Sequence, residues 1–97
     1  MGLKITSATN TSKGVGSAVY VMINEVYAPK SLNAQIGVKT YKTKAERDAD
    51  INDTCEAYGV KAMYPITLNS IDDDITAIYA LLKSELEAEG KTVVDAI

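Results

Sequence analysis

Residues 70–90 read SIDDDITAIYALLKSELEAEG and contain the clearest structural pattern in the chain. Apolar side chains recur there at spacings of three and four residues, which places them on one face of an α-helix. These side chains are Ile71, Ile75, Ile78, Leu81, Leu82 and Leu86. Ser70 is a suitable N-terminal cap with Asp73 as its capping-box acid, and Gly90 is a suitable C-terminal stop. We therefore predict an amphipathic helix that packs one face against a sheet.

The segments before this helix carry the patterns of β-strands. Residues 18–27 are rich in β-branched and aromatic side chains on both faces, which favours a central strand. In residues 34–43 apolar and polar side chains alternate, as in an antiparallel strand with one exposed face. A turn around residues 30–31 joins the two segments into a hairpin. Residues 61–68 predict a third strand, and Pro65 places it at an edge or a bulge.

The remaining segments are shorter and more polar. The pattern of residues 3–6 predicts a short strand. We expect the apolar tail 92–97 to dock back onto the sheet as another strand. Residues 7–17, SATNTSKGVGS, are small and polar and contain two glycines, which predicts a loop or an arm. The charged run 44–54 contains a single helical turn at residues 45–48.

Together these segments predict one α+β domain that spans residues 1–97. A chain of 97 residues has the length of one domain. We expect a small antiparallel meander of three to four strands, covered on one face by the C-terminal amphipathic helix. A sheet covered on one side only leaves its other face and its edges open to contact with other chains.

The composition argues against catalysis. The chain has no histidine, which removes the commonest general base and metal ligand. Cys55, its one cysteine, therefore lacks the usual activating partner and cannot form an intrachain disulfide. All the aromatic side chains are tyrosines, six in number, and so many hydroxyls favour positions at an interface. We expect no enzyme activity and assign no catalytic residue.

Three patterns resemble ligand sites, and each has a simpler interpretation. Asp72, Asp73 and Asp74 stand in the first turn of the predicted helix, where three consecutive side chains point apart and the helix dipole favours negative charge. The acidic run 48–53 lacks the glycine and the glutamate of a calcium loop. Residues 14–17, GVGS, lead into a strand, whereas a phosphate loop leads into a helix. We therefore expect no metal and no cofactor.

The net charge of −3 is unevenly distributed along the chain. Residues 1–50 hold seven basic and four acidic side chains, and residues 51–97 hold three basic and nine acidic ones. Two oppositely charged faces of one domain explain this pattern, and head-to-tail contact between copies is the alternative. The basic side chains near Tyr41 form a short run in an acidic chain, so we expect no nucleic-acid partner. No apolar run has membrane-spanning length, so we expect no membrane partner.

Several runs of the sequence resemble a family of small virion proteins of tailed bacteriophages. In that family a hairpin ends in a Tyr-x-Ser/Thr-Lys-x-Ala-Arg-Asp-Ala-Gly-like segment, and a Tyr-Leu-Lys-type helix and a short Val-Asp ending follow. The corresponding runs here are YVMINEV (20–26), IGVKTYKTKAERDAD (36–50), YPI (64–66), AIYALLK (77–83) and VDAI (94–97). The resemblance covers roughly residues 18–97 and carries no catalytic residue.

The resemblance implies a non-enzymatic structural subunit of the neck, tail or baseplate, present in multiple copies. Its location would be the virion, assembled in the host cytoplasm, and its partners would be other virion proteins and copies of itself. A small monomeric binding or regulatory module is the alternative. We expect the contacts on the arm, at the hairpin end and at exposed tyrosines. The candidate interface residues are Lys13, Tyr20, Tyr27, Lys39, Tyr41, Lys42, Lys44, Arg47 and Tyr58.

Overall fold

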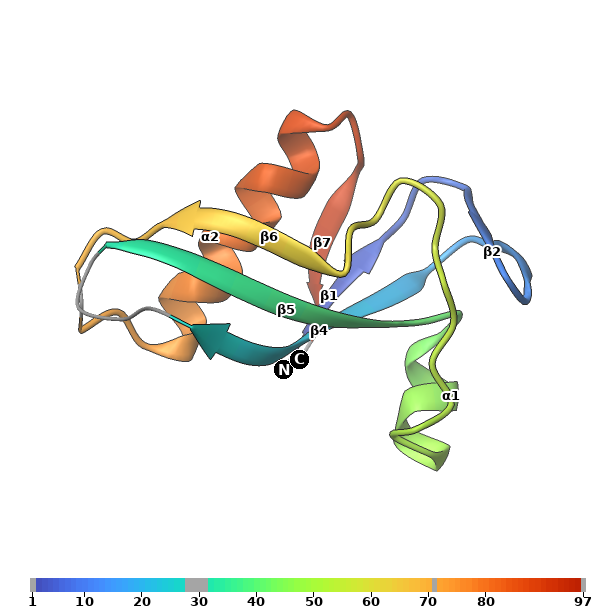
Figure 1. Ribbon diagram of the computed structural model, residues 1–97. Coiled ribbons are helices and arrows are strands. Elements are labelled where there is room, and N and C mark those ends of the chain that lie inside the picture. The colour runs from blue at the N-terminus through green and yellow to red at the C-terminus, as the bar shows by residue number, and fades with distance from the viewer. Residues whose placement is uncertain (1, 28–31, 71, 97) are drawn as a thin grey trace.

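The computed structural model describes residues 2–27, 32–70 and 72–96 and confirms an α+β fold. Figure 1 shows a twisted sheet with one long helix behind it and a short hairpin at one end. The helices and strands of the described residues are β1 (Gly2–Ile5), β2 (Thr9–Thr11), β3 (Gly14–Gly16), β4 (Val19–Tyr27), β5 (Asn33–Tyr41), α1 (Lys44–Ala49), β6 (Met63–Thr67), α2 (Ile75–Ala88) and β7 (Val93–Ala96). The predicted turn around residues 30–31 lies outside the described residues.

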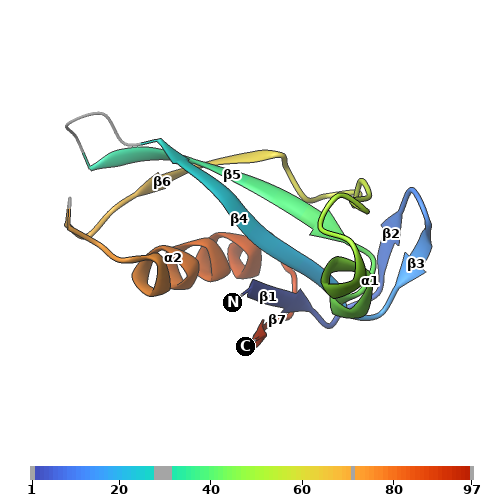
Figure 2. The same ribbon diagram turned by 90° about the horizontal axis from the view of Figure 1, so that it is seen from below.

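The main sheet is antiparallel, with five strands in the order β6-β5-β4-β1-β7 among the described residues. Strands β4, β5 and β6 form the predicted meander. The short strands at the two ends of the chain add to its far side, so the sheet is wider than the three to four strands predicted. Gly2 pairs with Ala96, which brings the two ends of the described chain together (Figure 2).

Strand β4 contains a bulge that the alternation of its side chains does not reveal. Its register with β5 shifts between Ile23 and Glu25, which leaves Asn24 as the extra residue. The Ile23 N–H donates a 2.8 Å hydrogen bond to the hydroxyl of Tyr79 on α2. This bond ties the sheet to the helix next to the bulge.

Helix α2 begins later than predicted. Asp74 is the N-cap, and its side chain accepts a 2.9 Å hydrogen bond from the Ala77 N–H. Ser70 is therefore not the cap. Its hydroxyl and the Asp73 carboxylate accept from the N–H groups of Asp72 and Asn69 instead and hold the turn before the helix. Glu89 is the C-cap of α2.

Gly90 ends the helix as predicted, with a φ of 89° that favours glycine. Ile75 stands in the first helical turn and remains 47% exposed, so it is not part of the buried face. Ile71, also assigned to that face, lies outside the described residues.

The core lies between α2 and one face of the sheet, which we call the inner face. The helix buries Ile78, Tyr79, Leu82 and Leu86 there, as its periodicity predicts. The sheet contributes the apolar side chains that alternate along β1, β4, β5 and β6. These are Leu3, Ile5, Val19, Val21, Ala34, Ile36, Val38, Tyr64 and Ile66. The face turned away from α2 is called the outer face below.

Residues 7–17, predicted as a loop or an arm, form the hairpin β2–β3. The Thr11 hydroxyl donates to the Gly14 carbonyl at 2.6 Å and accepts from the Lys13 N–H at 3.1 Å, so one side chain closes the turn. Thr9 and Thr11 are buried. The polar residues of this segment therefore form a hairpin that is attached to the domain.

Candidate interaction surfaces

One end of the outer face is closed by α1. Tyr20, Met22, Tyr41 and Ala96 form a second buried cluster there. The rings of Tyr20 and Tyr41 lie 6.2 Å apart. The Arg47 guanidinium lies 6.0 Å from the centre of the Tyr20 ring, and its Nη2 lies 3.4 Å from the Met22 sulfur. The sheet is thus covered by α1 at this end and by no other helix of the described residues on this face.

Tyr20 and Tyr41 are therefore not surface anchors, contrary to the prediction. Both side chains have an exposed fraction of 0%. The Tyr41 hydroxyl donates to the Ile51 carbonyl at 2.5 Å, so it finds its partner inside the fold. Two facing tyrosines on adjacent strands pack well against each other, and the short helix that follows β5 folds back over them.

Three of the basic candidates form ion pairs within the chain. Lys13 pairs with the Asp53 carboxylate. Lys44 and Arg47 both contact Asp48, at 2.9 Å and 3.1 Å. Their hydrogen bonds, that of Lys44 first, lower the pKa of the Asp48 carboxyl. These charges are thus paired within α1 and between the hairpin and Asp53, and their role in contacts with other chains stays a prediction.

The other candidates do not lie together. Tyr27 is 59% exposed at the far end of β4 from Tyr20. Tyr58 is 67% exposed in the segment beside β2. Lys39 and Lys42 are half-buried near the other end of β5. The structure thus divides the predicted interface into separate places and leaves the two tyrosines as its most exposed members.

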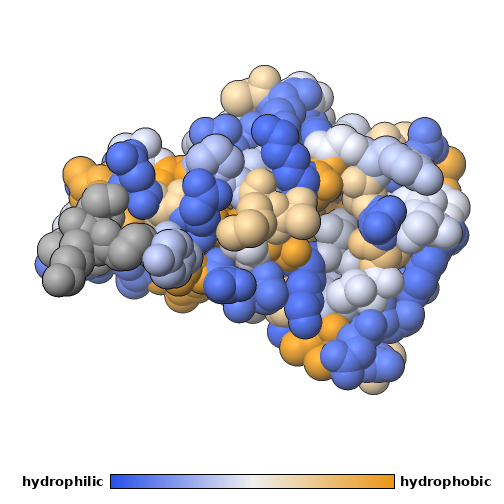
Figure 3. Space-filling view, in the orientation of Figure 1, coloured by the Kyte–Doolittle hydropathy of each residue, from blue (hydrophilic) through white to orange (hydrophobic). Residues whose placement is uncertain are grey.

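The outer face carries exposed apolar side chains that are far apart in the sequence. The strand register places Tyr27, Gln35 and Pro65 in one row across β4, β5 and β6. In the next row on this face, Gly37 lies beside Met63. Met63 is 48% exposed. In Figure 3 this face shows apolar patches separated by hydrophilic side chains. Sequence reasoning missed Met63, because its exposure depends on which face of β6 the helix covers.

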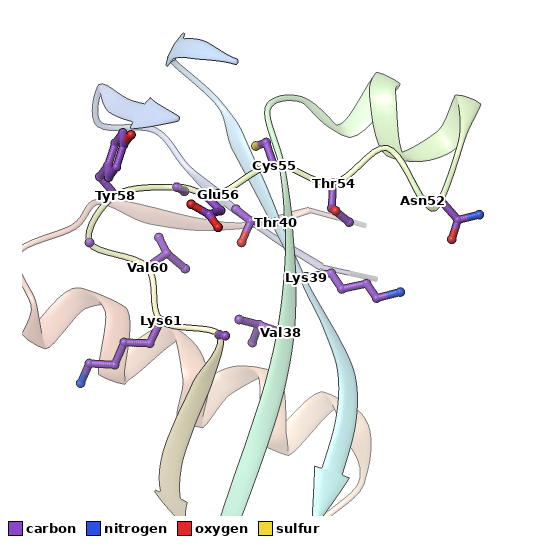
Figure 4. A pocket seen from close by; sticks show the side chains of 13 residues that line it. Val38, Lys39, Thr40, Asn52, Thr54, Cys55, Glu56, Tyr58, Val60 and Lys61 are labelled. Atoms are coloured by element: carbon purple, nitrogen blue, oxygen red, sulfur yellow. The ribbon is translucent and has the colours of Figure 1, made fainter. Parts of the chain in front are cut away.

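A cavity of about 550 Å³ lies beside β5 (Figure 4). The Val38 N–H donates to the Ala62 carbonyl at 2.9 Å, and the Cys55 N–H donates to the Thr40 carbonyl at 2.8 Å. Between these two hydrogen bonds, the chain from Cys55 to Ala62 runs away from the edge of β5. Both backbone groups of a residue in an antiparallel strand point to the same side, so the Val38 carbonyl and the Thr40 N–H face the cavity.

The far wall of this cavity is held in place by the β2–β3 hairpin. The Ser12 N–H donates to the Glu56 carbonyl at 2.8 Å, and the Tyr58 N–H donates to the Asn10 carbonyl at 2.9 Å. The wall is therefore attached to the hairpin and stands away from β5. The cavity offers backbone hydrogen-bonding groups and a mixed lining, which suit a short extended peptide or a small polar molecule.

Cys55 is half-buried at this cavity and is not an activated nucleophile. Burial raises the pKa of its thiol, and the hydrogen bond with Thr11 and the nearby Lys13 counteract this in part. No group of three or more histidine, cysteine, aspartate or glutamate side chains that could hold a metal ion occurs in the described ranges.

Tyr64 connects β6 to the end of α2. Its hydroxyl donates to Glu89 at 3.1 Å and accepts from the Lys61 N–H at 3.0 Å. Burial raises the pKa of Tyr64 to about 12; the Lys61 N–H opposes this shift, and the negative charge of Glu89 adds to it. The buried phenol is thus held in its neutral form well above the pH at which a free tyrosine ionises.

We expect Tyr64→Phe to reduce the loss of stability at alkaline pH. An unfolded tyrosine ionises near pH 10 and the folded Tyr64 near pH 12, so the folded state holds the extra proton between these values. Stability therefore falls across this window in the native chain, by on the order of 2 kcal/mol from this group. Urea unfolding at about pH 9 and about pH 11.5 measures the difference. An equal loss in both proteins would contradict the assignment.

No family model, curated protein or solved structure matches this chain. Within the described residues, no helix is both long enough and apolar enough to cross a membrane. The similarity to phage virion proteins stays a prediction.

Proposed function

We propose that the protein is a non-enzymatic structural subunit of a multi-copy assembly and acts through protein–protein contacts. The observation that carries this proposal is the one-sided sheet: α2 covers the inner face, while the outer face keeps Tyr27 and Met63 exposed beyond the reach of α1. Exposed apolar side chains on an open sheet face are typical of surfaces that bind another chain.

The virion of a tailed bacteriophage is the setting that the sequence resemblance implies. The partners there are other virion proteins and further copies of this chain, and assembly takes place in the host cytoplasm. Neither a nucleic acid nor a membrane takes part in the proposed contacts.

A small monomeric binding or regulatory module is the second candidate. It is favoured by the cavity beside β5, toward which the Val38 carbonyl and the Thr40 N–H point. In that case the ligand would be a short extended peptide from a different protein.

Light scattering on the purified chain tests the first proposal. We expect a mass above the 10.4 kDa of one copy. The mass should rise between about 10 and about 200 μM, because association follows mass action. Met63→Lys places a charge on the outer face and should lower the mass. Ala88→Lys makes the same change in charge at the exposed end of α2 and should leave the mass unchanged.

A mass of 10.4 kDa at every concentration would contradict self-assembly and favour the binding module. An equal effect of Met63→Lys and Ala88→Lys would remove the outer face from the proposal, because a general effect of charge would then explain both results.

A further inference from the structure

The two edges of the sheet differ in how well they resist pairing with another strand. In β6, residues alternate between those whose backbone bonds to β5 and those whose backbone points outward. The hydrogen bond from the Val38 N–H to the Ala62 carbonyl fixes this alternation. Tyr64 and Ile66 therefore bond to β5, and the backbone of Pro65 points outward. Proline has no N–H, and the outer edge of β6 therefore lacks a donor at its centre. This edge is protected.

The edge at β7 carries no such protection. The Thr6 N–H donates to the Thr92 carbonyl at 2.8 Å, and this sets the phase of the β1–β7 ladder. Val94 and Ala96 bond to β1, so the N–H and C=O groups of Val93 and Asp95 point away from the sheet. No strand of the described chain lies on that side. β7 also contains no proline, lysine or bulge to discourage pairing, and its one charged side chain, Asp95, has a partner in Lys83.

We propose that β7 pairs antiparallel with β7 of a second copy, around a two-fold axis at Val94. This contact rests on the proposed function and gives it a specific interface. It joins two five-stranded sheets into one continuous sheet. Val93 of each copy lies opposite Asp95 of the other, and each such pair exchanges two backbone hydrogen bonds.

The neighbouring registers are less favourable. In one, Asp95 lies opposite Asp95 of the second copy, and like charges directly opposite destabilise a strand pair. In the other, Asp95 lies opposite Lys91, whose N–H already donates to the Leu86 carbonyl at 3.2 Å. The register centred on Val94 avoids both conflicts.

The side chains of β7 are compatible with a second copy of the same strand. Val94 is 42% exposed on the outer face and would pack against its own counterpart. Asp95 lies toward α2 and contacts Lys83 at 3.7 Å, so each carboxylate has a cationic partner within its own copy. A cavity of about 290 Å³ next to Asp95, between α2 and the ends of β1 and β7, extends the largely apolar surface at this edge.

Disulfide trapping tests the register. In a Cys55→Ser background, Val94→Cys places the two new thiols on opposed residues about 4.5 Å apart at Cα, within reach of a disulfide. We expect a covalent dimer on non-reducing electrophoresis. Asp95→Cys is the matched control. Its thiols lie two residues apart along the ladder and on the inner face, so we expect no covalent dimer.

A proline substitution tests the hydrogen bonds. In the Met63→Lys background, which removes the outer-face contact, Asp95→Pro deletes the outward N–H and leaves the ladder to β1 intact. Two of the four cross-copy hydrogen bonds are lost, so self-association should weaken roughly tenfold or more by sedimentation. Asp95→Ala also loses the pair with Lys83 but keeps the N–H, so it should associate like the background protein.

The outcomes separate this inference from the proposed function. An oligomer in which Val94→Cys forms no more covalent dimer than Asp95→Cys, or in which Asp95→Pro associates as tightly as Asp95→Ala, overturns the β7 contact and leaves the proposed function standing. A chain that stays monomeric throughout overturns both.

Discussion

Replacement of Leu82 by alanine should lower the free energy of unfolding by about 2–5 kcal/mol. Leu82 has an exposed fraction of 0% at the centre of the buried face of α2. The substitution removes apolar contacts with the inner face of the sheet and leaves a cavity that the surrounding strands cannot fully close. Domains of this size have a total stability of about 5–15 kcal/mol, so the loss is a large part of the whole.

Urea unfolding followed by circular dichroism measures this change. Glu85→Ala is the control, because Glu85 stands on the exposed side of the same helix. We expect it to change the stability by less than about 0.5 kcal/mol. A similar small effect of Leu82→Ala would mean that α2 does not pack on the sheet in solution as described.

The second large effect is expected at Gly2. A Cβ at this position would lie 2.3 Å from both Cζ and Oη of Tyr20, closer than real atoms approach. The Tyr20 ring is fully buried next to Tyr41 and beneath Arg47, so it has little room to move away. We expect Gly2→Ala to destabilise the protein by about 1–3 kcal/mol through overpacking.

A double-mutant cycle identifies the cause. Tyr20→Leu is itself destabilising, but it removes the atoms that the new Cβ would meet. Gly2→Ala should therefore have a much smaller effect in the Tyr20→Leu background than in the native chain. An equal effect in both backgrounds would place the cause in the backbone of β1 instead of in the contact with Tyr20.

The main elements of the fold were predictable because their patterns are local. The spacing of Ile78, Leu82 and Leu86 indicates one helical face, and the alternation of Ala34, Ile36 and Val38 indicates one strand face. These positions are buried as predicted. Gly90 also ends the helix where the sequence indicates, because a positive φ favours glycine in any tertiary context.

Errors occurred where several local interpretations fitted the same residues. Ser70 and Asp74 are both good helix caps, and the helix begins at the later one. The segment 7–17 has the composition of a loop, but Thr11 closes a turn within it and the chain beside Cys55 provides hydrogen-bonding partners. The attachment of this hairpin depends on residues that are distant in the sequence.

The candidate surfaces were the least predictable part. Tyrosine is amphipathic, so its identity alone does not distinguish Tyr20, which is buried, from Tyr58, which is exposed. The exposure of Met63 and the open edge of β7 follow from strand order and from the side on which α2 lies. No local pattern in either segment contains this information.

The sequence by itself determined the type of most elements, the face of each that is apolar and the absence of histidine chemistry, because these properties reside in individual residues and in spacings of two to four. The tertiary structure alone decided that β1 and β7 add to the sheet beside β4, that α1 buries Tyr20 and Tyr41, and that β7 forms the open edge opposite β6. Burial and edge exposure depend on which distant segments pack together. That choice follows from the free energy of the whole fold, to which every segment contributes.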